Sequence, residues 1–289
     1  MDAFSLCCAS CIALGDPASL FGEGSQDLRV EALGAESFAV ASDVTTGVQD
    51  SGFQLDALSL GVAGAPHEDV RVRVTLDTDL QSFGRSEAYL EGRPARGLTI
   101  RAGRWRVGPG VVSARRVPDR CFVDAPLATE TFLGRDGLID QGFAVTYQTP
   151  WKLLPVSLTA GILSGIDAAS FDALYPNGLG GTVFERLLYL VRLEAQIGAL
   201  FDRPLSISAT FLTGQNGTGP DNRTDMVSVD AAGSFAVGSG WTVGFDLEYL
   251  LRRFGIPYAL VVEGGLSADV TVAWRQAWLG LRVDVFGLP

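Results

Sequence analysis

The chain has 289 residues, of which 47% are hydrophobic and only 19% are charged, so its composition excludes a disordered protein. The formal net charge of −11 argues against a nucleic-acid partner, because a polyanion requires a basic surface. No apolar run of roughly 18 residues occurs, so the chain is expected either to be soluble or to cross a membrane as strands.

The first 24 residues are predicted to be a leader. Residues 3–15 are apolar and small, as in the central region of an export signal, although Asp2 stands where a basic residue is typical. Three of the four cysteines lie in this stretch and Cys121 stands apart, so no disulfide framework is expected. No further ligand stands near them, and we expect neither a metal nor a cofactor. The chain is thus predicted to consist of a degenerate signal-like leader with an N-terminal segment, 1–24, and one β-barrel domain, 25–289, which contains an irregular insert at 107–141.

From residue 25 onwards, apolar and polar residues alternate, which predicts strands with one apolar and one polar face. In the segment 70–77, Val70, Val72, Val74 and Leu76 are the apolar members. The same pattern recurs at 143–148, 191–197, 205–211, 241–249, 266–275 and 277–285. Turn signals occur between segments, among them 65–69, 92–94, 201–204, 238–240 and 254–257. About 12 to 14 strands and no amphipathic helix are expected.

Two all-β architectures satisfy this pattern. In a soluble sandwich or propeller the apolar faces would meet in a core, whereas in a transmembrane barrel they would meet lipid and the polar faces would line a lumen. Segments of about 9 to 12 residues suit tilted strands that cross hydrocarbon, since soluble strands average about 5 to 6. Aromatic residues stand at segment ends, and short turns alternate with long loops such as 166–184 and 214–224. We therefore predict an antiparallel transmembrane β-barrel, with a soluble all-β domain as the alternative.

Residues 107–141 break the alternation and are predicted to form an irregular loop that folds into the barrel. They follow an expected strand at 98–106 and precede another at 142–147. Loops of this length are uncommon in compact folds unless they have a function. Inward folding would bury the apolar side chains and let the charged ones narrow the pore, while a solvated external loop is the alternative. The apolar residues are Phe122, Val123, Leu127, Phe132 and Leu133.

Several short motifs, in this order and spacing, resemble bacterial outer-membrane porins related to the phosphate-selective porin O/P type. Within residues 52–165 they are the strand 98–106 with VGPG at 107–110, FVDAPL at 122–127, FLGRDGL at 132–138, QGF at 141–143 and PW at 150–151. Later motifs are FLTGQNG at 211–217, EYLLRR at 248–253 and GLRVD at 280–284. The resemblance implies a signal peptide, a bacterial outer-membrane location with lipid around the barrel, and a homotrimer.

Two features depart from that family. Its members usually run longer and finish on a strand with a terminal aromatic residue, whereas this sequence stops at Pro289 just after a strand, so closing strands are expected to be missing. A truncated chain, a gene fragment and a smaller barrel all fit this ending. The family's phosphate selectivity rests on arginine ladders and lysine clusters, and Lys152 is the single lysine here. The resemblance therefore implies a porin without implying phosphate as its solute.

No catalytic constellation is recognised, and we expect no enzyme. The one histidine, His67, is expected in a solvated turn, and neither Ser59 nor Asp69 near it belongs to a nucleophile-elbow motif. Asp246 and Glu248 would lie on one face of a strand, about 7 Å apart, where two carboxylates could serve glycoside hydrolysis. Such a pair is more often the polar wall of a pore.

The sequence thus predicts a porin-like channel for passive diffusion of small hydrophilic solutes or ions, with a non-conducting surface barrel (a receptor, adhesin or structural protein) as the alternative. The polar phase of the strands predicts these lumen-facing residues: Arg71, Arg73, Arg192, Glu194, Asp246, Glu248, Arg282 and Asp284. The charged residues of the loop are predicted to form the constriction: Arg115, Arg116, Asp119, Arg120, Asp124, Arg135 and Asp136. The net charge predicts no ion preference, because only lumen charges act on a permeating ion.

Overall fold

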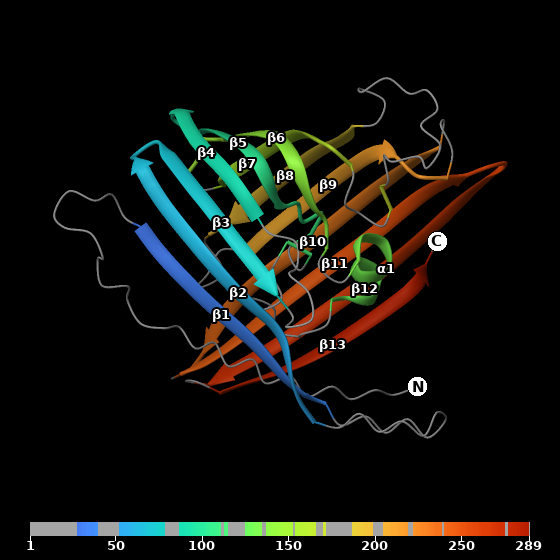
Figure 1. The fold of residues 1–289 in the computed structure, drawn as a ribbon. Coiled ribbons are helices and arrows are strands. Elements are labelled where there is room, and N and C mark those ends of the chain that lie inside the picture. The colour runs from blue at the N-terminus through green and yellow to red at the C-terminus, as the bar shows by residue number, and fades with distance from the viewer. Residues whose placement is uncertain are drawn as a thin grey trace. The chain divides into compact units, whose positions relative to one another are not determined.

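A computed structural model describes thirteen strands and one short helix (Figure 1). The described residues are 28–39, 52–78, 87–110, 113–114, 125–134, 137–152, 154–165, 170–171, 187–198, 205–218, 222–238, 240–274 and 277–288. Only the backbone is described for 28–39, 52–60, 77–78, 277–278 and 288. The predicted leader, the cysteines and every residue predicted to form the constriction lie outside these ranges. The chain forms two compact units, 1–88 with 116–124 and 89–115 with 125–289.

Three antiparallel strands and the first two residues of a fourth make up the described part of the first unit. The three strands pair in chain order and are β1 (Leu28–Ala39), β2 (Gly52–His67) and β3 (Val70–Thr78). The apolar side chains of β3 are exposed, as Val72, Val74 and Leu76 show, whereas Thr75 between them is fully buried. The predicted alternation is therefore present in β3, with its apolar phase on the exposed side.

The other ten strands, apart from the first two residues of β4, belong to the second unit and also follow one another as an antiparallel meander. They are β4 (Glu87–Ala95), β5 (Leu98–Arg106), β6 (Ile139–Gln148), β7 (Val156–Leu163), β8 (Leu188–Ile197), β9 (Leu205–Gln215), β10 (Arg223–Val237), β11 (Trp241–Ile256), β12 (Ala259–Trp274) and β13 (Ala277–Leu288). Connections at one end are short, whereas those at the other end include the long stretches 107–138, 164–187 and 216–222. No helix among the described residues is long and apolar enough to span a membrane.

The strands of the second unit expose their apolar side and bury their polar side, which is the reverse of a soluble sheet. Phe211, Val229 and Leu247 are 42%, 48% and 43% exposed, while Ser208 and Glu248 on the opposite side are both 2% exposed. In water this arrangement would be unfavourable, because it leaves apolar surface hydrated and removes a carboxylate from solvent. Hydrocarbon around the apolar side makes the same arrangement favourable. The alternative in which the apolar faces meet in a core is not what these strands show.

The outward face of β8–β13 carries a band without a charged residue at any described position. Trp241 and Trp274 lie at one end of this band, with their rings stacked and their centroids 5.8 Å apart. At the other end the first charged residue of β11 is Arg253, twelve residues after Trp241. At about 3.4 Å per residue and a tilt of about 45°, this stretch covers about 29 Å, close to the hydrocarbon thickness of a bilayer.

Several predictions about connections are wrong in their bounds. The signals at 65–69 and 254–257 lie mostly inside strands, since β2 extends to His67 and β11 to Ile256. The signal at 92–94 lies inside β4, and the turn is formed by Arg96 and Gly97. Position 97 requires glycine, because its φ is +75° and a Cβ there would come within 2.5 Å of the Gln148 carbonyl oxygen. The expected loop at 214–224 is shorter, since pairing extends β9 to Gln215 and starts β10 at Arg223. The irregular stretch predicted at 107–141 ends at residue 138 and contains a helix, α1 (Leu127–Leu133).

Adjacent residues on β13 test which side of the sheet contacts lipid. Val283 pairs with Ala268 in the middle of β12 and is 54% exposed on the apolar side, whereas Asp284 belongs to the opposite side. Val283→Arg is expected to impair assembly in lipid vesicles, because arginine near the bilayer midplane costs about 2–4 kcal/mol. Asp284→Arg, the matched control, is expected to assemble like the parent chain. Equal folded yields of the two variants, measured by heat-modifiable mobility on gels, would contradict this assignment.

Candidate functional site

A line of polar side chains crosses the buried side of the second unit. Direct register between neighbouring strands aligns six residues from β8 to β13, which we call the acidic row: Glu194, Ser208, Asp230, Glu248, Ser267 and Asp284. Four of the six are carboxylates. Because buried carboxylates require hydrogen-bond donors or cations, the partners of this row decide what the site can do.

Neighbours on the same side supply some of these partners. Ser208 Oγ donates to Asp230 Oδ1 at 2.5 Å. Glu194 Oε1 accepts from Gln196 Nε2 at 3.3 Å and from Ser206 Oγ at 3.2 Å, and its Oε2 lies 3.5 Å from Arg192 Nη2. Residues of the sheet itself therefore neutralise part of the negative charge of the acidic row and connect its members by hydrogen bonds.

A second group lies next to the acidic row, toward the tryptophan end of the band. Asp246 of β11 pairs in register with Asp269 of β12, which pairs with Arg282 of β13. Arg282 donates from Nε to Asp269 Oδ1 at 2.7 Å and from Nη2 to Asp269 Oδ2 at 2.9 Å. This forked, nearly buried pair is the strong type of charge-assisted contact and holds both side chains in place.

Residues 107–138 are called the insert here, and those of them that the structure describes in the second unit contact the acidic row. Glu248 receives two hydrogen bonds from the insert, from the Ser113 backbone N–H to Oε2 at 3.1 Å and from Thr129 Oγ1 to Oε1 at 3.3 Å. Arg192 Nη1 donates to the Gly108 carbonyl oxygen at 3.0 Å. A Cβ on Gly110 would overlap the Glu248 carboxyl group, so the insert approaches this side chain as closely as glycine allows. The predicted inward fold is present in the described parts of the insert.

Helix α1 is the element that the sequence reading missed. Pro126 precedes it and Gly134, with φ at +85°, follows it, which are ordinary start and stop signals of a helix. Its buried face consists of Ala128, Thr129, Phe132 and Leu133, whose spacing is helical. Seven residues are too few for periodicity to stand out against the surrounding strands. Leu127, expected to pack, is 47% exposed, and Phe122 and Val123 lie outside the described residues.

Close packing holds α1 against β12 and β13 (Figure 1). A Cβ built on Gly265 of β12 would lie 2.5 Å from the Ala128 Cβ, so only glycine leaves room for the helix there. The pairing of β12 with β13 also shifts register between Gly264 and Gly265. Phe132 packs on Phe286 of β13, with ring centroids 5.6 Å apart. The sheet is thus shaped to receive the helix.

A second segment, Ser170–Phe171, is also held on the buried side. Thr224 Oγ1 donates to the Ser170 carbonyl oxygen at 2.7 Å, and Ser170 Oγ donates to the Phe132 carbonyl oxygen at 2.6 Å. Arg252 joins the two segments, since its Nη1 donates to Ser170 Oγ at 2.9 Å and its guanidinium lies 4.3 Å from the Phe132 ring centroid. Arg252 also pairs with Glu263 of β12.

An apolar cluster surrounds these two segments, so the buried side is polar in one zone and apolar in another. The cluster includes Phe132, Leu133, Phe171, Leu188, Leu212, Met226 and Leu250. In β11, Leu250 of the cluster lies two residues from Glu248 and toward the end with the long connections. The insert and the Ser170–Phe171 segment therefore cover apolar wall as well as the acidic row.

The residues predicted to face the lumen lie on the side opposite the exposed apolar phase. In the first unit Arg71 is exposed and Arg73 half-buried. In the second unit Arg192, Glu194 and Arg282 are half-buried, Asp246 and Glu248 are buried, and Asp284 is exposed. Their lumen role stays a prediction. Sequence reasoning missed Asp230, Asp269 and Arg252. The alternation of polar with apolar residues could have indicated that Asp269 and Arg252 lie on the polar side of their strands. For Asp230 the alternation is weak, because the residues that follow it at 231–233 are all small.

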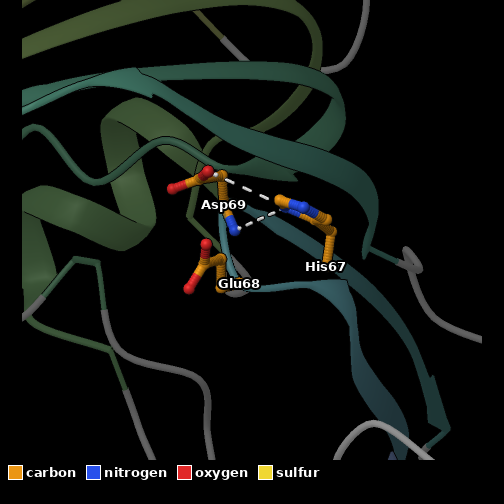
Figure 2. Close-up of side chains that lie close together, drawn as sticks. All are labelled: His67, Glu68 and Asp69. Atoms are coloured by element: carbon orange, nitrogen blue, oxygen red, sulfur yellow. Dashed lines mark hydrogen bonds and ion pairs between the residues drawn. The ribbon is translucent and has the colours of Figure 1, made fainter.

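His67, Glu68 and Asp69 form an exposed cluster at the turn between β2 and β3, and their possible ligand atoms lie within 4.8 Å of one another (Figure 2). The Asp69 backbone N–H donates to His67 Nδ1 at 3.2 Å, and Asp69 Oδ2 lies 3.7 Å from the same nitrogen. This bond already uses the Nδ1 lone pair, so the arrangement is that of a hydrogen-bonded hairpin turn. His67 is exposed, as predicted, but it is the last residue of β2, and the turn itself is formed by Glu68 and Asp69.

Comparison with known proteins gives similarity of structure alone. No protein-family model matches the sequence, and no curated protein matches it. OmpT, an outer membrane protein of Vibrio cholerae, has a TM-score of 0.51 at 12% identity, with 92% of this chain and 90% of that chain covered. Its trimer form gives 0.45 at 10% identity over 90% and 89% of the two chains. A mutant of the Rh. blastica porin gives 0.41 at 12% identity over 90% and 100%.

The similarity to OmpT and the long antiparallel strands show the fold class of this chain. It is an all-β protein of the transmembrane β-barrel type, as the alternation predicted. Identity this low shows the fold and leaves the activity to be argued from the chain's own residues.

Glu248 is predicted to hold the insert in place. Glu248→Ala removes the acceptor of two buried donors, each of which then costs about 1–3 kcal/mol, so the insert should detach more readily. Hydrogen exchange of residues 107–138 in detergent micelles should speed up by at least tenfold. Ser267→Ala, one strand away in the acidic row and 3% exposed, is the control that should leave exchange unchanged. Equal exchange in both variants would show that Glu248 does not hold the insert.

Proposed function

We propose that this protein is a porin-like channel of the bacterial outer membrane, through which small hydrophilic solutes or ions diffuse passively. One observation carries the proposal: the strands present an uncharged apolar side outward, and an insert with polar contacts lies on the opposite, polar side. In a channel this pairing gives lipid contact outside and a narrowed, wet passage inside.

The outward band supports the location. Its charge-free span of about 29 Å fits a bilayer, and its tryptophans stand where aromatic residues mark a membrane interface. The resemblance to outer-membrane porins of the phosphate-selective porin O/P type supports the same location, and it adds a signal peptide and a homotrimer to the proposal. Selectivity for phosphate is not included, because Lys152 is the chain's single lysine.

The acidic row and the insert suggest where the passage is narrowest. Glu248, Arg192 and the forked pair of Arg282 with Asp269 form a wall of fixed charges beside the insert. Fixed charges at a constriction set the local field, and through it the preference among permeating solutes. The remaining charges of the constriction in this proposal are those of residues 115–124 and 135–136, outside the described ranges.

Enzymatic chemistry is not part of the proposal. Asp246 and Glu248 share one side of β11, as a pair of hydrolytic carboxylates would. However, both Glu248 oxygens accept hydrogen bonds from the insert, which leaves this carboxylate poorly placed to attack a substrate or activate water. Its position fits a structural acceptor in a wall.

Planar-bilayer recording of the folded chain tests the channel. We expect stepwise conductance at a steady voltage, and Glu248→Ala should change the single-channel conductance while Ser267→Ala does not. The reason is that a loosened insert alters the narrowest cross-section. Correctly folded protein that inserts into the bilayer without conducting would contradict the channel.

A plugged barrel is the second candidate function, with the long connections serving a receptor, adhesin or structural role at the cell surface. The apolar cluster around Phe132 and Phe171 favours it, since both side chains are fully buried between the wall and the inward segments. On this alternative the parent chain does not conduct, and Phe171→Ala should open it. Phe211→Ala, which truncates an outward phenylalanine, is the control that should stay closed.

A further inference from the structure

A second polar row lies on the outward face of the second unit, on the opposite side of the sheet from the acidic row. Direct register aligns four residues from β8 to β11, which we call the outer row: Tyr189, Thr213, Asp225 and Arg253. Each stands two residues beyond an apolar outward residue of its own strand, as Asp225 does beyond Val227. The outer row is therefore the first polar row after the charge-free band, at the end with the long connections.

The row contains a positive charge that is well exposed. Arg253 has a side-chain exposure of 61%, and its Nη1 lies 3.8 Å from Asp225 Oδ2, beyond hydrogen-bond distance. Asp225 is 33% exposed and accepts a hydrogen bond from Thr213 Oγ1 at 2.6 Å. An exposed ion pair at this separation contributes little to stability, so fold maintenance does not explain the arginine.

A second arginine stands next to this pair on the same face. Arg223 lies two residues before Asp225 in β10 and is exposed. A Cβ on Gly255 of β11 would come within 3.1 Å of the Arg223 carbonyl oxygen, so the two strands are still close together at this level. Two arginines thus flank one aspartate, and the patch carries a net positive charge at the edge of the apolar band.

We propose that Arg223 and Arg253 bind the phosphate of an anionic lipid headgroup, in the leaflet on the side of the long connections. This inference rests on the proposed membrane location. A headgroup phosphate lies just outside the hydrocarbon, at the depth where the charge-free band ends. Arginine matches it because the planar guanidinium can donate two parallel hydrogen bonds to phosphate oxygens. The acyl chains below would lie along the apolar residues of β10 and β11.

The experiment uses the full chain, folded in neutral detergent and then mixed with phosphatidylglycerol or phosphatidylcholine. Native mass spectrometry counts the lipids retained. We expect the parent chain to retain phosphatidylglycerol in preference to phosphatidylcholine. Arg223→Gln and Arg253→Gln should each weaken retention of phosphatidylglycerol by roughly fivefold, and the double variant by more than tenfold. Retention of phosphatidylcholine should not change.

Two further variants sharpen the test. Asp225→Asn removes the competing carboxylate and should increase retention of phosphatidylglycerol. Arg93→Gln is the control. Arg93 is an exposed arginine of β4 that points to the face opposite the exposed Leu90, and its removal should leave retention of phosphatidylglycerol unchanged. Each variant is first checked for a folded, heat-modifiable band, so that a loss of lipid is not mistaken for a loss of fold.

The outcomes separate this inference from the proposed function. If the double variant retains as much phosphatidylglycerol as the parent chain, the phosphate site is wrong while the membrane location stands. If millimolar inorganic phosphate binds the lipid-free protein and displaces phosphatidylglycerol, the site belongs to free phosphate and the lipid assignment is overturned. If the folded parent chain retains neither lipid and enters no vesicle, both this inference and the membrane location fail.

Discussion

A carboxylate withdrawn from water needs hydrogen-bond donors, and this requirement ties the parts of the second unit together. Glu248 is 2% exposed in the middle of the sheet, and its nearest strand neighbours in the acidic row, Asp230 and Ser267, bring it no positive charge. The insert supplies donors from a backbone N–H and a threonine hydroxyl. The position of the insert is thus a consequence of where the sheet buries an acceptor.

The reversed burial of the sheet explains why so much polar pairing occurs inside it. On the proposed membrane location, lipid replaces water at the outward face, so the apolar residues there gain nothing from packing together and remain on the surface. Side chains of the other face crowd one another instead, which favours paired groups such as Arg282 with Asp269. Where pairing gives way to apolar packing, around Phe132 and Phe171, the inward segments take the place of a protein core.

Much of this architecture follows from period-two alternation, because one rule assigns every strand residue to a face. The alternation predicted about 12 to 14 strands, the strand 98–106 and the apolar outward phase without knowledge of any contact. It could not find the apolar cluster, because that cluster depends on segments far apart in the sequence. The sequence indicates the apolar cluster only where two adjacent strand residues are both apolar, as Phe211 and Leu212 are, or Leu250 and Leu251. Both faces are apolar there, which indicates cover from a second layer.

The site was harder to predict than the fold for a related reason. Alternation identifies which side a residue faces, and it placed Glu248 correctly on the polar side, but its role depends on Ser113 and Thr129, which belong to an irregular segment with no period. Arg252 shows the same limit. Its strand phase puts it on the buried side, yet its contacts with Ser170 and Phe132 join two connections that no local rule brings together.

The residues of one strand, β11, show how the two faces of the sheet differ. Its outward residues run from Trp241 through an apolar stretch to Arg253, which is the order that the proposed membrane location requires. Its inward residues change within a few positions from Glu248 to Leu250 to Arg252, and so meet in turn the insert, the apolar cluster and the second inward segment. The two faces of one strand can change in polarity independently along its length only because successive side chains point to opposite faces. The outward order of residues matches the depth of the proposed bilayer, and the inward order matches the segments that cover the wall. A change on one face should therefore leave the other face intact.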